Sequence, residues 1–192
     1  MYRVTLEDAR ARLEPLDAVH AEDLARASAD GNLSQLWVTH VPAPRDLPAE
    51  IARRLALERS GAMLPFAVID LRTGSAVGMT TYTNVDAANR RVEIGSTWYA
   101  RSVQRTGLNV SCKRLLLGHA FERLDTIAVE FRTHVLNVAS RRAIERLGAR
   151  LDGILRSHEF ASNGTLRDTC VYSIVASEWP AVRALLDDRL GR

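Results

Sequence analysis

The feature that most limits the fold is a change in hydrophobic periodicity midway along the chain. In the first half, three strand-like runs follow one another with only short turns between them. In the second half, strand-like and helix-like segments alternate. This order predicts one mixed α/β sheet with helices on its faces. The expected strands are 11–16, 64–71, 76–83, 91–99, 126–133, 150–160 and 166–176, and the expected helices are 18–29, 48–60, 108–124, 138–147 and 178–189.

A chain of 192 residues, 46% of them hydrophobic, can bury one sizeable core, and its length favours a single domain over residues 1–192. No apolar run approaches the ~20 residues of a membrane-spanning helix, and the first residues lack the apolar core of a signal peptide. Cys112 and Cys170 form no paired motif, which favours a reducing compartment. We therefore expect a soluble, cytoplasmic protein without a membrane partner.

The net charge of +3 is weak evidence for an anionic partner, because no stretch concentrates it. Nucleic-acid-binding proteins typically interleave a basic stripe with aromatic residues. Aromatic residues make up only 6% of this chain and its arginines are scattered, so we expect no direct contact with nucleic acid. The five histidines show no metal-ligand spacing, so we also expect no metal site.

The segment from Trp98 to Asn109 carries the strongest chemical signal. A strand ends there, a loop with Gly107 follows, and an amphipathic helix begins near Leu108. The first N–H groups of a helix lack partners within it, and with the helix dipole they form a site for phosphate. Such a turn is more often simple topology than a binding site. No nucleotide P-loop, dinucleotide-binding, serine-hydrolase or zinc-protease motif competes with it.

Three ordered motifs resemble those of the GCN5-related N-acetyltransferases (GNAT). The run Gln104–Asn109 resembles the acetyl-CoA loop of that superfamily, Q/R-x-x-G-x-G/A. Asn137 and Ser140, ahead of a helix closed by Gly148, resemble its second cofactor segment. The stretch Gly153–Phe160 and the residues after it are similar to the RimJ/RimL-type enzymes, which modify N-terminal α-amines of ribosomal proteins.

The resemblance implies a GNAT-like fold: a mixed, mostly antiparallel sheet with helices on both faces and a splayed central strand pair. It implies acetyl-CoA as the cofactor. Asn109 departs from the Gly or Ala usual at its position, so its side chain either crowds the pyrophosphate or contacts it. The implied cofactor-binding residues are Trp98, Tyr99, Gln104, Arg105, Thr106, Gly107, Leu108, Asn109, Asn137, Ser140 and Arg141.

The resemblance also implies direct acetyl transfer to an amine, without a covalent acyl-enzyme. In the RimL type, Ser140 would protonate the departing thiolate and Glu159 would accept the amine proton. Glu93 is the second candidate base, because many members of the superfamily place one on this strand. Structural alternatives stay open: Asn137 also suits a helix N-cap, Ser140 a solvent-facing helical position, and Glu159 a solvated strand edge.

The implied function is acetyl transfer to a primary amine, here a protein N-terminal α-amine. An α-amine, with a pKa of about 7.7–8.0, needs less help at neutral pH than lysine at about 10.4. Two alternatives remain: a small-molecule amine (antibiotic, polyamine or aminoacyl conjugate) as acceptor, or a non-catalytic sensor that binds coenzyme A. We expect the acceptor pocket at the first two helices and the 37–48 loop, where Trp37 either lines the entrance or anchors the core. Whether the protein is a homodimer stays open.

Overall fold

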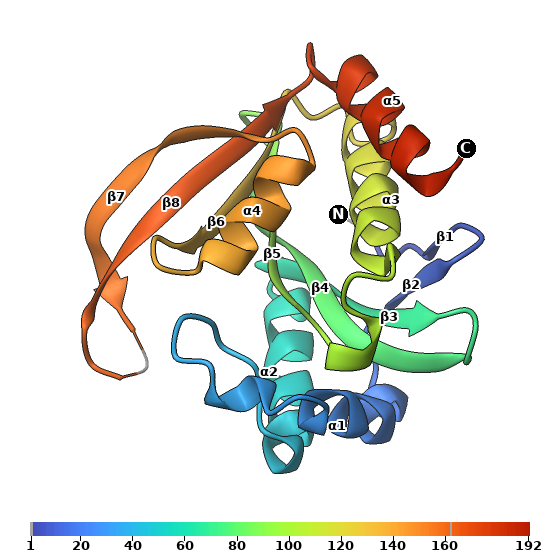
Figure 1. Cartoon of the computed structure of the whole chain (residues 1–192), viewed down its shortest axis with the longest axis vertical. Coiled ribbons are helices and arrows are strands. Elements are labelled where there is room, and N and C mark those ends of the chain that lie inside the picture. Colours follow the sequence, from blue (N-terminus) through green and yellow to red (C-terminus); the bar gives the residue numbers. More distant parts are fainter. Residues whose placement is uncertain (1, 162) are drawn as a thin grey trace.

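One sheet organises the residues that the structure, a computed structural model, describes: 2–161 and 163–192 (Figure 1). Its eight strands follow the order β1-β2-β3-β4-β5-β6-β8-β7. The strands are β1 (Leu6–Glu7), β2 (Ala11–Pro15), β3 (Met63–Asp70), β4 (Ser75–Asp86), β5 (Arg91–Tyr99), β6 (Ala128–His134), β7 (Arg150–Phe160) and β8 (Leu166–Val175). The helices are α1 (Ala21–Ala29), α2 (Leu47–Arg59), α3 (Leu108–Glu122), α4 (Val138–Arg146) and α5 (Trp179–Leu190).

Helices cover both faces of the sheet, because successive side chains of a strand point to opposite sides. On β4, the Thr81 hydroxyl accepts a hydrogen bond from Nη1 of Arg54 in α2 (2.8 Å). The next residue, Tyr82, points the other way, and its hydroxyl donates to the Leu116 carbonyl oxygen in α3 (2.5 Å). Thus α2 packs on one face and α3 on the other, on either side of the sheet in Figure 1.

The predicted fold class is confirmed: neighbouring strands pair antiparallel except β5 and β6, which are parallel. One expectation about the elements was wrong, and one element was not expected. Strand β4 continues to Asp86, beyond the expected end at Thr83, because Asp86 pairs with Arg91 after a register shift at which Asn84 adopts a left-handed φ of 47°. The two-residue strand β1 was not expected, since it is too short to show any periodicity.

Strands β5 and β6 part soon after they meet, which opens the centre of the sheet. Their parallel register joins Arg91, Val92 and Glu93 to residues 128–130. Beyond that point β5 continues to residue 99 and β6 to residue 134, but the two strands no longer pair with each other. Ser96 follows with a φ of 47°, where the register between β4 and β5 shifts. A bulge of this kind bends a strand. The splayed central pair is therefore present, and we call it the open seam.

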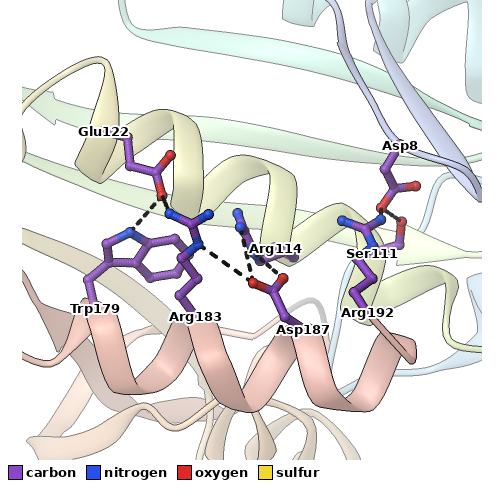
Figure 2. Close-up of polar contacts among 8 residues, drawn as sticks. All are labelled: Asp8, Ser111, Arg114, Glu122, Trp179, Arg183, Asp187 and Arg192. Atoms are coloured by element: carbon purple, nitrogen blue, oxygen red, sulfur yellow. Dashed lines mark hydrogen bonds and ion pairs between the residues drawn. The ribbon is translucent and has the colours of Figure 1, made fainter.

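Helix α5 is fastened along α3 (Figure 2). Trp179 stacks on Phe121 with ring centroids 5.3 Å apart, and its indole Nε1 donates to Glu122 (3.0 Å). Further along the same two helices, Arg114 Nε donates to Asp187 (2.7 Å). These contacts hold α3 in place and so fix the loop that leads into it.

The turn between β1 and β2 is tied to the first part of α3. Asp8 accepts hydrogen bonds from the Ser111 hydroxyl (2.5 Å) and from the backbone N–H groups of Arg10 (2.8 Å) and Ala11 (3.0 Å). Arg192 forms an ion pair with the same carboxylate, as Figure 2 shows. The turn therefore brings residues from the start of the chain beside the N-terminus of α3.

Within the described ranges, every helix is too short or too polar to cross a membrane. Those ranges also hold no group of three or more His, Cys, Asp or Glu side chains placed to bind a metal ion. Cys112 and Cys170 are both buried free thiols.

Candidate active site

The loop from β5 to α3 has a fixed shape set by its own side chains. A 3-10 turn (Arg101–Val103) follows β5, and then Gln104 Nε2 donates back to the Tyr99 carbonyl oxygen (3.1 Å). The Thr106 hydroxyl donates to the Val103 carbonyl oxygen (2.7 Å). Arg105, with a φ of 64°, lies in the left-handed region, which helps to turn the chain toward the helix.

This loop presents a run of backbone N–H groups without partners. The first hydrogen bond of α3 runs from the Ser111 N–H to the Gly107 carbonyl oxygen (3.0 Å). For the six N–H groups of residues 105–110, the described part of the chain offers no acceptor. Free donors at a helix N-terminus, together with the positive end of the helix dipole, form a site for an anion.

Gly107 keeps this site open to a ligand. Its φ of 90° is a left-handed value that glycine adopts without strain. Among the described residues, a Cβ placed on Gly107 would have one neighbour within 4 Å, the Arg10 Nη1 at 3.6 Å. Arg10 comes from the turn between β1 and β2 and adds a positive charge beside the free amides. No sequence motif indicates this contact, because the two residues are far apart in the chain.

Glu93 occupies the last paired position of the open seam. It is 8% exposed, Asn84 Nδ2 donates to its Oε2 (2.7 Å), and Arg132 Nε lies 3.5 Å from the same oxygen. Burial raises the pKa of the Glu93 carboxyl, while Asn84 and Arg132 act in the opposite direction. A carboxyl of raised pKa at the start of an unpaired strand edge is suited to accept a proton near neutral pH.

Comparison with known proteins identifies the family. Residues 10–150, most of the chain, match the model of the acetyltransferase (GNAT) domain. This chain belongs to the GNAT acetyltransferase family. A GCN5-related N-acetyltransferase from Brucella melitensis, solved as a crystal structure, is 33% identical, with a TM-score of 0.89 over 98% of this chain and 86% of that chain.

Two further proteins are similar to this chain over different lengths. YdaF of Bacillus subtilis, a candidate ribosomal N-acetyltransferase, is 35% identical over 109 residues, which make up 57% of this chain and 58% of YdaF. The match thus spans little more than half of that relative. RimJ of Mycobacterium smegmatis, solved in complex with CoA-disulfide, is 24% identical, with a TM-score of 0.83 over 100% of this chain and 96% of that chain. At that identity, the likeness to RimJ shows a shared fold alone.

The residues of the loop fit the diphosphate of coenzyme A, which the GNAT resemblance implies. Free N–H donors, a glycine without a crowding neighbour and the Arg10 guanidinium are the groups that bind phosphate oxygens. Leu108 and Trp98 have buried side chains, so each would offer a ligand mainly its backbone. Asn109 is half-buried on the first turn of α3, and its amide forms no hydrogen bond within the described residues. Crowding and contact by this side chain therefore both stay open.

The second predicted segment is held by its own capping contacts. Asn137 caps α4, since its Oδ1 accepts from the Ser140 N–H (3.0 Å). This contact confirms the N-cap and leaves the Asn137 amide nitrogen free for a ligand. Arg141 donates to the Tyr172 hydroxyl from Nε (3.0 Å) and to the Val135 carbonyl oxygen from Nη1 (3.3 Å). The guanidinium thus ties α4 to the sheet, and a role for it toward the cofactor stays a prediction.

The other predicted base, Glu159, has a different environment from Glu93. It lies near the end of β7 with a side chain 48% exposed, and its Oε1 is 3.2 Å from Nη1 of Arg167 on β8. His158, the preceding residue, directs Nδ1 to the Thr169 hydroxyl (3.2 Å). Glu159 is therefore a paired carboxylate of the β7–β8 hairpin, whereas Glu93 is buried at the open seam.

A surface cavity of about 440 Å³ lies in part of the region expected for the acceptor pocket, beside the 37–48 loop and α2 but not α1. Its lining comes from the loop between α1 and α2 and from α2 itself, and includes Leu36, Asp46 and Glu50. Trp37 in the same loop packs edge-on against His134 at the end of β6, with ring centroids 5.3 Å apart. The loop thus reaches from α2 to the open seam. His134, Asn84 and Arg10 had no role in the sequence analysis, because their neighbours are distant in the chain.

Proposed function

We propose that this chain is an acetyl-CoA-dependent N-acetyltransferase. The observation that carries the proposal is the position of the six N–H groups of residues 105–110, which have no acceptor among the described residues and follow the strand that borders the open seam after one short turn. A phosphate site and an unpaired strand edge are thereby joined in one continuous segment. Such a segment suits a long ligand with a diphosphate at one end and a thioester at the other.

In this proposal, the chain binds the cofactor mainly through its backbone. The N–H groups of residues 105–110 and Arg10 hold the diphosphate, and Gln104 and Thr106 keep the loop in shape. Over residues 94–99, β5 pairs with β4 on one side only, and the N–H groups on the side facing β6 offer donors to the pantetheine and to the thioester carbonyl. Asn137 and Ser140 lie at the start of α4, where Ser140 would protonate the departing thiolate. Bound acetyl-CoA would supply the activated acetyl group.

We place proton acceptance from the amine at Glu93, through water where the amine does not reach it directly. Its buried position raises its pKa toward the range in which a general base works best. Glu159 is the second candidate carboxylate, and it is half-exposed and ion-paired with Arg167 instead of buried at the open seam.

We propose a protein N-terminal α-amine as the acceptor. The cavity beside the α1–α2 loop and the likeness to YdaF, named for acetylation of ribosomal proteins, both support this choice. Ribosomal proteins are cytoplasmic, so we place the protein there as well. Whether it works as a homodimer is a question for light scattering on the purified chain.

Mass spectrometry of acetylated products tests the proposal. The purified chain is incubated with acetyl-CoA and a panel of peptides with free N-termini, polyamines and aminoglycosides. We expect acetylation at the peptide α-amine. Transfer only to polyamines or aminoglycosides would show that the acceptor is a small-molecule amine and not a protein N-terminus. Tight binding of coenzyme A without transfer to any amine would indicate a sensor, and no binding would overturn the proposal.

A further inference from the structure

His134 carries a buried hydrogen-bond donor that nothing in the described structure satisfies. The residue is 4% exposed at the end of β6, and its Nδ1 accepts a hydrogen bond from the Leu136 backbone N–H (3.0 Å). Because Nδ1 is an acceptor, the proton of the neutral ring lies on Nε2. Nε2 is buried and has no partner among the described residues. An unmade hydrogen bond of this kind costs stability, so it commonly marks a place for a ligand.

The charge state of His134 suits a permanent donor. Burial lowers the pKa of its imidazole, and the neighbouring Arg167 lowers it further, whereas Asp168 and Glu159 act the other way. The ring is therefore neutral at physiological pH and always presents Nε2–H. Arg167 carries a second buried donor, Nε, without a partner in the described ranges. Neither group accepts a hydrogen bond at these atoms, so both require an oxygen.

Strand register places these donors on the acceptor side of the sheet. His134 pairs with Thr169 of β8, and Arg167 lies two residues along β8, so both share one face. Residue 130 lies four residues before His134 on β6 and therefore shares its face of the sheet. It pairs with Glu93, so the proposed base lies on that face as well. The ring of Trp37 crosses His134 at 85° from the α1–α2 loop. The free donors thus lie between the open seam and the loop that borders the cavity.

We propose that His134 is a specificity-determining residue whose Nε2–H binds a carbonyl oxygen of the amine acceptor. This inference rests on the proposed function and narrows its substrate class. A peptide or amino-acid amide carries a carbonyl next to its α-amine, and that oxygen can accept from Nε2–H. A polyamine or simple alkylamine offers only donors when charged, and it leaves the buried N–H unsatisfied. The site therefore selects amines carried on an amino acid or peptide.

Two substitutions separate the donor from the structural role of the ring. In His134→Asn, the side-chain oxygen can replace Nδ1 as acceptor for the Leu136 N–H, but no donor reaches the position of Nε2. In His134→Gln, the longer side chain can place its amide N–H near that position. Melting temperatures of both variants, measured with and without coenzyme A, report whether the fold and cofactor binding survive.

The acceptors are a short peptide amide with a free N-terminus and the alkylamine of matched length that lacks the carbonyl. We expect the wild-type chain to prefer the peptide. His134→Asn should raise the KM for the peptide about ten-fold, which corresponds to about 1.4 kcal/mol, and leave the alkylamine unchanged. His134→Gln should recover part of the loss.

The possible contrary results distinguish a failure of the role of His134 from a failure of the proposed function. An equal loss for both amines in His134→Asn, or a loss confined to the affinity for coenzyme A, would overturn the role of His134 while leaving the proposed function intact. Absence of transfer to any amine by the wild-type chain would instead overturn the proposed function itself.

Discussion

At the scale of the residue, Gly107 provides the most specific test of the cofactor loop. Its φ of 90° means that Gly107→Ala strains the backbone by about 1 kcal/mol and places a methyl group among the free amides. We expect affinity for coenzyme A to fall about ten-fold, measured by calorimetry. Gly74→Ala, in the turn between β3 and β4 at a φ of 73°, has the same backbone cost. If Gly74→Ala weakened binding equally, general destabilisation and not the loop would be the cause.

Glu93 gives a pH-dependent prediction. A base must be deprotonated to act, and burial raises the Glu93 pKa above its usual 4.5. Activity should therefore fall as pH decreases through that raised value, at a higher pH than for an exposed glutamate. Glu93→Gln should remove this acidic limb of kcat/KM and reduce kcat by about 10²–10⁴-fold. Glu159→Gln is the matched control; if it removed the limb instead, Glu159 would be the base.

Lys113 gives a prediction about stability. It is 5% exposed, and its Nζ donates to the hydroxyls of Thr97 (2.8 Å) and Thr80 (3.2 Å). Burial lowers the Lys113 pKa from 10.5 to about 7. The unfolded chain therefore holds a proton that the folded chain releases above pH 7, so the free energy of unfolding should rise with pH by up to about 1.4 kcal/mol per unit.

Urea unfolding between pH 7 and 9 measures this effect, and Lys113→Met should remove the slope. The window stops at pH 9 because burial raises the Cys112 pKa from 9.0 to about 12, so the loss of the unfolded thiol's proton offsets the rise above that pH. Parallel pH profiles of the wild type and Lys113→Met would show that the lysine is not buried as described.

At the scale of the element, local pattern predicted most of the fold. Strands β5 and β7 lie at their predicted bounds, Arg91–Tyr99 and Arg150–Phe160. Asn137 caps α4, as its residue type favours. The partners of these elements could not be predicted in the same way. Arg10 beside Gly107 depends on a turn that packs against α3, and periodicity carries no information about such contacts.

The fastening of α5 to α3 leads to an element-scale prediction. Trp179 is 7% exposed, stacks on Phe121 and bonds to Glu122. Trp179→Ala should lower the free energy of unfolding by about 3–5 kcal/mol in urea titration. Asp188→Ala, an exposed change on the same helix, should alter it by no more than about 0.5 kcal/mol. A small effect of Trp179→Ala would mean that α5 contributes little to holding α3.

At the scale of the whole molecule, the open seam and the loop act together. The seam alone would be an unpaired strand edge, and the loop alone would be one more helix N-terminus. Placed end to end, they join the edge of β5 over residues 94–99, which β6 leaves unpaired, to the N–H groups of residues 105–110, with Glu93 at one end and Arg10 near the other. We therefore expect one ligand to cover both segments at once.

Hydrogen exchange of backbone amides, with and without coenzyme A, tests that expectation directly. Amides without partners exchange fast, and a bound ligand slows them. We predict that saturating coenzyme A slows exchange at residues 105–110 and at the β5 amides beyond Glu93 that face the open seam. Binding that leaves both segments exchanging as before, with protection elsewhere in the chain, would contradict it.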